Sequence, residues 1–216
     1  MIYTSTLKQA EGLCNKHGIG SSLNSIGILY DYKGDIETAL DYFNRSLKIF
    51  EDLDDKRGVG GRLSNIGTVH FGKDDYDKAL NYFNRSLAIA DDLDDKIMMG
   101  QILNNIGTVY DCKGDIETAL DYYNRSLKIC EDFDDKSGIG GRLINIGNVH
   151  IDKDDLDTAL DYYEKAISIS EELGDRRRLV FSLKDIGSVH HDKGDYDKAL
   201  NYLEQSLSMQ KEIGLK

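Results

Sequence analysis

Residues 23–50 read LNSIGILYDYKGDIETALDYFNRSLKIF, and this stretch decides the fold. Its first part places small and apolar residues at i, i+3, i+4 and i+7, the spacing of one face of a helix: Leu23, Ile26, Gly27 and Tyr30. After the polar turn at residues 33–35, a second helical stripe follows: Ile36, Ala39, Leu40, Phe43, Leu47 and Phe50. Gly27 and Ala39 are small enough to let two helix axes approach closely. The stretch therefore predicts a pair of packed helices.

The helix-pair pattern recurs five times at a constant step of 40 residues. The dipeptide Ile-Gly marks each copy, at 26–27, 66–67, 106–107, 146–147 and 186–187. Self-similarity at such a period indicates a repeat protein in which each unit stacks on the next. Residues 4–23 align with residues 44–63, so a lone second helix precedes the first full pair. We therefore predict an all-α solenoid of about eleven helices.

The repeats predict one solenoid domain over residues 1–216. Its predicted divisions are a half repeat and five full repeats: 1–19, then about 20–56, 57–96, 97–136, 137–176 and 177–216. Between the helices of a pair, Gly34 or its equivalent Asp74 favours a left-handed stop, and Asp35 is expected to cap the next helix. In the last helix, Leu203 and Leu207 would face a following helix, so we expect apolar surface there.

The composition argues against nucleic-acid and membrane partners. The chain has 39 acidic and 27 basic residues, a formal net charge of −12, and no window of clustered Lys and Arg. No run approaches the ~20 apolar residues that cross a bilayer, and residues 1–18 do not have the features of a signal peptide. The three cysteines follow neither zinc nor disulfide spacing and are interpreted as reduced thiols. We predict a cytoplasmic protein.

Residues that carry chemistry in other proteins have packing explanations here. His70, His150 and His190 occupy the place that a tyrosine holds in other repeats, so we expect them inside the helix pairs rather than at a metal. Glycine runs such as residues 58–61 lack the Lys-Ser/Thr of a phosphate-binding loop and are attributed to close helix crossing. No pair of nucleophile and base is recognisable. We predict a protein without enzymatic activity, catalytic residues, metal or cofactor.

The repeat pattern resembles the tetratricopeptide repeat (TPR). The resemblance rests on Leu-x-x-Ile-Gly-x-x-Tyr at 23–30 and Gly-Asp-x-x-x-Ala-Leu-x-Tyr-Phe-x-x-Ser-Leu at 34–47, and it covers essentially the whole chain. The unit departs from the usual one because it has 40 residues rather than 34 and lacks the usual tryptophan and proline. It is more similar to the long-unit branch in kinesin light chains, LGN-type adaptors and bacterial signalling proteins. The resemblance implies a right-handed superhelix with a concave groove.

A recurring amide marks the face of the first helix opposite to the core stripe. The position of Ser25 holds an amide in three later repeats and a carboxylate in the last: Asn65, Asn105, Asn145 and Asp185. In long-unit TPR proteins, the resemblance implies that such asparagines hold the backbone of an extended peptide. The physical reason is independent, because a carboxamide offers one acceptor and two donors to peptide N–H and C=O groups. Helices ~10 Å apart meet an extended chain at about every third residue.

Other residues of that face complete the predicted peptide-binding site. They lie on either side of the amides or flank them: Asn24, Asn104, Lys184, Thr68, Thr108, Asn148, Phe71, Arg62 and Arg142. Phe71 is a large apolar side chain where solvent is expected and can seat an apolar anchor of the ligand. Arg62 and Arg142 can pair with acidic partner groups, whereas the net negative charge would steer a basic peptide. In an alternative interpretation, the asparagines only link neighbouring helices by hydrogen bonds.

These observations predict a non-catalytic protein-interaction module that binds an extended peptide or partner segment in its groove. Two alternatives remain at this point. The chain is a scaffold that forms homo-oligomers through its terminal helices, or it is the sensory or regulatory part of a larger signalling protein. The expected partner in the first interpretation is a protein or peptide, with no nucleic acid and no membrane.

Overall fold

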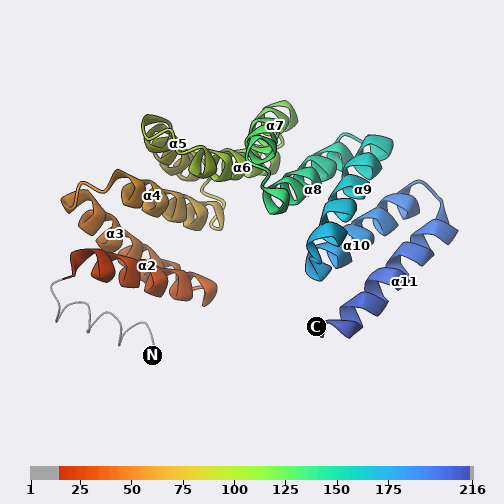
Figure 1. The fold of residues 1–216 in the computed structure, drawn as a ribbon, viewed down its shortest axis with the longest axis horizontal. Coiled ribbons are helices and arrows are strands. Elements are labelled where there is room, and N and C mark those ends of the chain that lie inside the picture. The colour runs from red at the N-terminus through yellow and green to blue at the C-terminus, as the bar shows by residue number, and fades with distance from the viewer. Residues whose placement is uncertain (1–14, 215–216) are drawn as a thin grey trace. The chain divides into compact units, whose positions relative to one another are not determined.

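The computed structural model describes residues 15–214, and all regular structure in this range is α-helical. The ten described helices follow one another through short turns (Figure 1). Their bounds are α2 (Lys16–Tyr32), α3 (Ile36–Asp52), α4 (Lys56–Phe71), α5 (Tyr76–Asp92), α6 (Lys96–Cys112), α7 (Ile116–Asp132), α8 (Lys136–Asp152), α9 (Leu156–Leu173), α10 (Arg176–Asp192) and α11 (Tyr196–Glu212). The all-α helical-repeat prediction is confirmed. The helix expected before them falls mainly on residues 1–14, outside the described residues.

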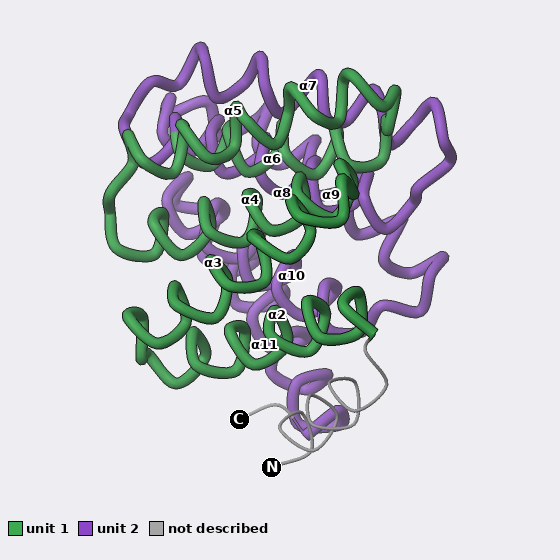
Figure 2. Tube along the Cα trace, turned by 90° about the vertical axis from the view of Figure 1, so that its left-hand side faces the viewer, with its two compact units in different colours: residues 1–109 green, residues 110–216 purple. Residues whose placement is uncertain are grey.

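The chain divides into two compact units, residues 1–109 and residues 110–216 (Figure 2). The boundary falls within α6. In unit 1, α2 packs on α3 and α4 packs on α5, and in unit 2 α8 packs on α9 and α10 packs on α11. Each pair also packs on the next within its unit, α3 on α4 and α9 on α10. The repeat bounds and the single solenoid domain stay predictions.

The turns follow the predicted chemistry. Gly34 has φ 76° and Asp74 has φ 57°, so both adopt the left-handed conformation that ends a helix. The Asp35 side chain accepts a hydrogen bond from the Thr38 backbone N–H, and Asp55 accepts one from Gly58 in the same way. These bonds satisfy backbone donors at the helix start that have no partner inside the helix. The predicted stops and aspartate caps are confirmed at these positions.

The Ile-Gly glycines allow an aromatic ring to fill the space between paired helices. A Cβ atom at Gly27 would lie 2.9 Å from the Phe43 ring, and one at Gly67 would lie 2.7 Å from Phe83. Both glycines therefore face a ring of the paired helix and leave no room for a larger side chain. The attribution of the glycine run at residues 58–61 to close helix crossing is wrong for Gly61, where a Cβ atom would meet nothing within 4 Å. The glycine runs thus mix crowded and open positions, because only some face the neighbouring helix.

A stacked pair of rings joins the two helices of each described repeat. His70 stacks on Tyr82 with ring centroids 5.4 Å apart, which confirms the predicted inward position of this histidine. His150 and His190 stack likewise on Tyr162 and Tyr202.

A serine of the second helix binds a backbone carbonyl of the first. Buried Ser46 donates its hydroxyl to the Gly20 carbonyl at 2.6 Å, and Ser86 donates to Gly60 at 2.7 Å. Ser206 and Val180 form the same bond in the last pair at 2.8 Å. These hydroxyl bonds satisfy polar groups in the core and fix the register of the two helices.

Candidate functional site

The predicted site residues are distributed over the first helices of the repeats in both units. Unit 1 carries Asn24 on α2, Arg62, Asn65, Thr68 and Phe71 on α4, and Asn104, Asn105 and Thr108 on α6. Unit 2 carries Arg142, Asn145 and Asn148 on α8, and Lys184 and Asp185 on α10. Their binding role stays a prediction.

In unit 1, two of the predicted amides bind each other. Asn65 Nδ2 donates to Asn24 Oδ1 at 2.8 Å, so this pair links α4 to α2. The alternative in which asparagines join neighbouring helices therefore holds for Asn65. Asn104 and Asn145 also have interaction partners. Because a carboxamide has three hydrogen-bonding groups, a bond of this kind orients the amide and leaves a ligand role compatible with it.

The two predicted arginines are held by serines of the preceding second helix. Arg62 Nε donates to Ser46 Oγ at 3.3 Å, and its guanidinium lies over the Phe50 ring, 3.9 Å from the centroid. Burial lowers the pKa of Arg62. Arg142 Nε donates in the same way to Ser126 Oγ at 2.9 Å. Both arginines are half-buried, so part of each is used in packing.

The remaining unit 1 residues make local contacts. Thr68 and Thr108 donate their hydroxyls to the carbonyls of Ser64 and Asn104, one helical turn earlier. Phe71 is half-buried and its ring contacts Tyr76 at 6.0 Å. Phe71 is therefore partly covered by its own repeat.

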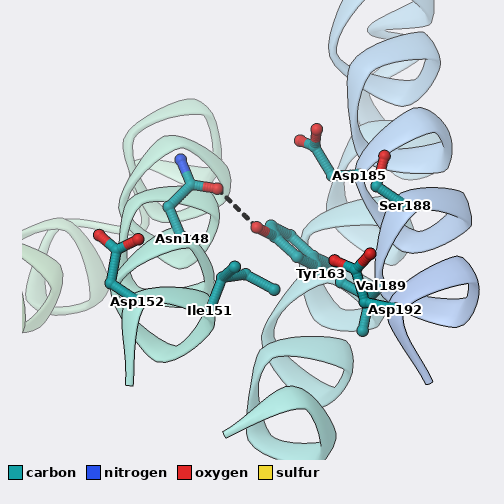
Figure 3. Close-up of a pocket in the computed structure, with 8 residues that line it drawn as sticks. All are labelled: Asn148, Ile151, Asp152, Tyr163, Asp185, Ser188, Val189 and Asp192. Atoms are coloured by element: carbon teal, nitrogen blue, oxygen red, sulfur yellow. Dashed lines mark hydrogen bonds between the residues drawn. The ribbon is translucent and has the colours of Figure 1, made fainter. Parts of the chain in front are cut away.

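In unit 2, two predicted residues meet at a hollow that we call the α8–α10 pocket (Figure 3). The pocket has a volume of about 290 Å³ and is lined by Asn148, Ile151, Asp152, Tyr163, Asp185, Ser188, Val189 and Asp192. Asn148 reaches it from α8 and Asp185 from α10, with Tyr163 of α9 between them. Asn148 and Asp185 are the two residues of the predicted site that line this pocket.

Hydrogen bonding and burial shape the α8–α10 pocket. The Tyr163 hydroxyl donates to Asn148 Oδ1 at 2.5 Å, which orients the amide at the pocket wall. Burial raises the pKa of Tyr163, and the neighbouring carboxylates Asp185 and Asp152 raise it further, so the phenol stays neutral. Burial also raises the pKa of Asp185, and the charge of Lys184 opposes this shift.

Sequence reasoning missed three ionisable residues of this pocket, Tyr163, Asp152 and Asp192. Tyr163 occupies the repeat position of Phe43 and Phe83, so its position predicts a core residue. Its hydroxyl group needs a polar partner, and this was the one sequence feature that indicated a polar site nearby. Asp152 and Asp192 are the last residues of α8 and α10, where acidic residues read as helix ends. Only the fold brings these two aspartates to one hollow.

Residues 15–214 contain no group of three or more His, Cys, Asp or Glu side chains that could hold a metal ion. No described helix combines the length and apolar character needed to cross a membrane.

The fold and this face define a class of protein, an α-helical repeat protein with side chains presented from successive first helices. Models of the tetratricopeptide repeat match residues 20–53, 62–132 and 142–212. These matches cover most of the sequence, and the chain belongs to the tetratricopeptide repeat family. No curated protein matches the sequence.

Solved structures with the same fold have low sequence identity. BtubC (BKLC) from P. vanneervenii has a TM-score of 0.86 at 18% identity, over 99% of this chain and 90% of that protein. A Rap protein complexed with Competence and Sporulation Factor has a TM-score of 0.80 at 17% identity, over 97% of this chain and 58% of its own. A putative kinesin light chain protein from Podosopora anserina has a TM-score of 0.73 at 11% identity, covering 91% and 96%. These likenesses show the fold.

Proposed function

We propose that this protein is a non-catalytic interaction module that binds an extended segment of a partner protein on unit 2, across α8 and α10. The observation that carries the proposal is the α8–α10 pocket, which three helices line with both apolar and hydrogen-bonding side chains. A concave, partly apolar surface with a few oriented polar groups is the usual form of a ligand site.

The polar groups of the pocket suit a peptide backbone. Asn148 presents a carboxamide that Tyr163 orients, and Ser188 presents a hydroxyl from the facing helix. These groups can pair with peptide N–H and C=O groups whatever the ligand side chains are. An extended segment needs about three residues, at ~3.3 Å each, to span the distance from α8 to α10.

The pocket supports binding rather than catalysis. Its two hydroxyl groups are engaged, Tyr163 with Asn148 and Ser188 with the Lys184 carbonyl. Neither hydroxyl has a hydrogen-bonded base of the kind that activates a nucleophile.

Two proteins of the same fold support the proposal by analogy. One Rap protein was solved with Competence and Sporulation Factor. A Rap conjugation gene regulator of plasmid pLS20, at 18% identity and a TM-score of 0.77 over 96% of this chain, was solved with the Phr* peptide. This chain spans 58% and 57% of those two proteins.

The test is a selection of random linear peptides displayed on phage against the full chain, followed by calorimetry with the enriched peptide. Ser188→Trp fills the pocket from an exposed position, so we expect it to weaken binding at least about tenfold. Ser208→Trp is the matched control, because Ser208 is exposed on α11 outside the pocket, and it should stay within about twofold. Equal affinities for both variants would move the site elsewhere.

A self-assembling scaffold is the second candidate, and one observation favours it. The outer face of α11 exposes large apolar side chains: Tyr196, Leu200, Leu203 and Leu207. Monomeric proteins seldom expose contiguous apolar patches of this kind without a use. We infer that two copies can pair through this face.

A further inference from the structure

We propose that the α8–α10 pocket accepts one positively charged side chain, Lys or Arg, of the bound partner segment. This inference rests on the proposed function and names the ligand chemistry of the same site. It follows from the charges around the pocket, from the absence of a cation that balances them among the described residues, and from a comparison of repeats within the chain.

Three carboxylates surround the pocket from two helices. Asp152 lies on α8, and Asp185 and Asp192 lie on α10, so both helices contribute carboxylates to the pocket lining (Figure 3). Asp185 is half-buried, whereas Asp152 and Asp192 stand at the exposed rim.

The described residues supply little positive charge to balance these carboxylates. Within residues 15–214, no Lys or Arg forms an ion pair with any of the three, and the partner of Asp192 is the neighbouring His191 at 3.1 Å. Lys184 is exposed on the same helix as Asp185 and acts on it only through its charge. The pocket thus keeps a net negative charge that a ligand cation can neutralise.

The scaffold itself does not require these acids. The positions 80 residues earlier, two repeats before, hold Gly72, Asn105 and Cys112 in place of Asp152, Asp185 and Asp192. Those earlier repeats form the same helices with neutral residues at these places. Partial burial of the Asp185 carboxylate costs stability, so its presence is explained better by a ligand than by folding.

The rest of the pocket fits a long cationic side chain rather than a metal ion. Ile151 and Val189 supply apolar surface for the methylene stem, while the carboxylates meet the charged end. The described residues include no metal-holding group of three acidic or His/Cys side chains, so the carboxylates are too dispersed to bind one ion. The net charge of −12 would also draw a basic segment toward the chain.

The experiment uses the same random phage-displayed peptides with the full chain and two charge-matched variants. The pocket variant is Asp152→Asn with Asp185→Asn and Asp192→Asn. The control is Asp52→Asn with Asp91→Asn and Asp161→Asn, which removes as many charges at exposed positions outside the pocket. We expect the wild type and the control to enrich Lys or Arg at one peptide position, and the pocket variant to lose this preference.

A second measurement replaces the selected lysine by norleucine, which keeps the stem and removes the charge. For the wild type we expect an affinity loss of at least about tenfold, and for the pocket variant a change within about twofold. Enriched peptides without a basic position, or an equal norleucine effect in both proteins, would overturn this inference and leave the proposed function intact. If the wild type enriches no peptide, both proposals fail.

Discussion

At the residue scale, His70 shows that the repeat accepts an imidazole in place of a tyrosine ring. Tyr30 stacks on Tyr42, and two repeats along the chain Tyr110 stacks on Tyr122 in the same way. His70 replaces the first ring of this stack, and its Nδ1 atom is buried with no hydrogen-bond partner, 3.6 Å from Asp75. Burial lowers the pKa of His70, although the Asp75 carboxylate opposes this effect.

This shift predicts a pH dependence of stability. The folded-state pKa lies below the unfolded one, so the unfolded chain binds the proton more readily. The contribution of neutral His70 is present above about pH 6.5 and is lost as pH falls through that region. We expect urea unfolding followed by circular dichroism to show a larger loss between about pH 7.5 and pH 5.5 for the wild type than for His70→Tyr.

His70→Tyr is conservative because the chain itself uses tyrosine at positions 30 and 110. His191→Tyr is the control, since His191 is exposed and lies outside the stacks with the second-helix tyrosines at 82, 162 and 202. It should keep the wild-type pH dependence. If His70→Tyr loses as much stability on acidification as the wild type, burial of this imidazole is not the cause.

At the element scale, the glycines of α4 separate crowding from helix propensity. Gly67 faces the buried Phe83 ring, whereas Gly61 of the same helix faces open space. Both are interior helix positions, where alanine is favoured over glycine by about 1 kcal/mol. The two sites therefore differ only in whether a methyl group has room.

We predict opposite effects of alanine at these two glycines. Gly67→Ala should lower the free energy of unfolding by about 1–3 kcal/mol, because the added methyl group displaces the Phe83 ring. Gly61→Ala should raise it by up to about 1 kcal/mol. Urea denaturation measures both. Stabilisation by Gly67→Ala would mean that the ring yields without cost.

The helix pairs were predictable because the same local sequence pattern occurs in five repeats. The Ile-Gly dipeptide, the aspartate caps and the left-handed turns are local features that recur at one step, so five copies agree on one interpretation. The α8–α10 pocket was only partly predictable. Asn148 and Asp185 follow from the helix face, but Tyr163 comes from another helix, and its approach depends on packing against Gly147.

At the scale of the whole molecule, the apolar face of α11 makes association measurable. Leu207 is 50% exposed and Leu200 57% exposed, so contact between two such faces would bury apolar area at little cost in packing. By light scattering, we expect the average mass to rise above 24.3 kDa as concentration increases.

Leu207→Glu should return the mass to that of one chain, because it puts a charge in the contact. Ser208→Glu adds the same charge beside the face and should leave association unchanged, since Ser208 is exposed on the next position of α11. A constant monomer mass for the wild type would remove the scaffold alternative and leave the interaction module.

The serine-to-carbonyl bonds have a consequence for how such a chain diversifies. Ser46 binds Gly20, Ser86 binds Gly60 and Ser206 binds Val180, so each bond joins the two helices of a single pair. A 40-residue repeat that has this serine therefore keeps its own buried hydrogen bond between paired helices when it is duplicated or exchanged, whereas the α8–α9 repeat has Ala166 at the position. Recombination between such repeats can bring new side chains to the exposed surface of a first helix while the buried serine-to-carbonyl bond is kept.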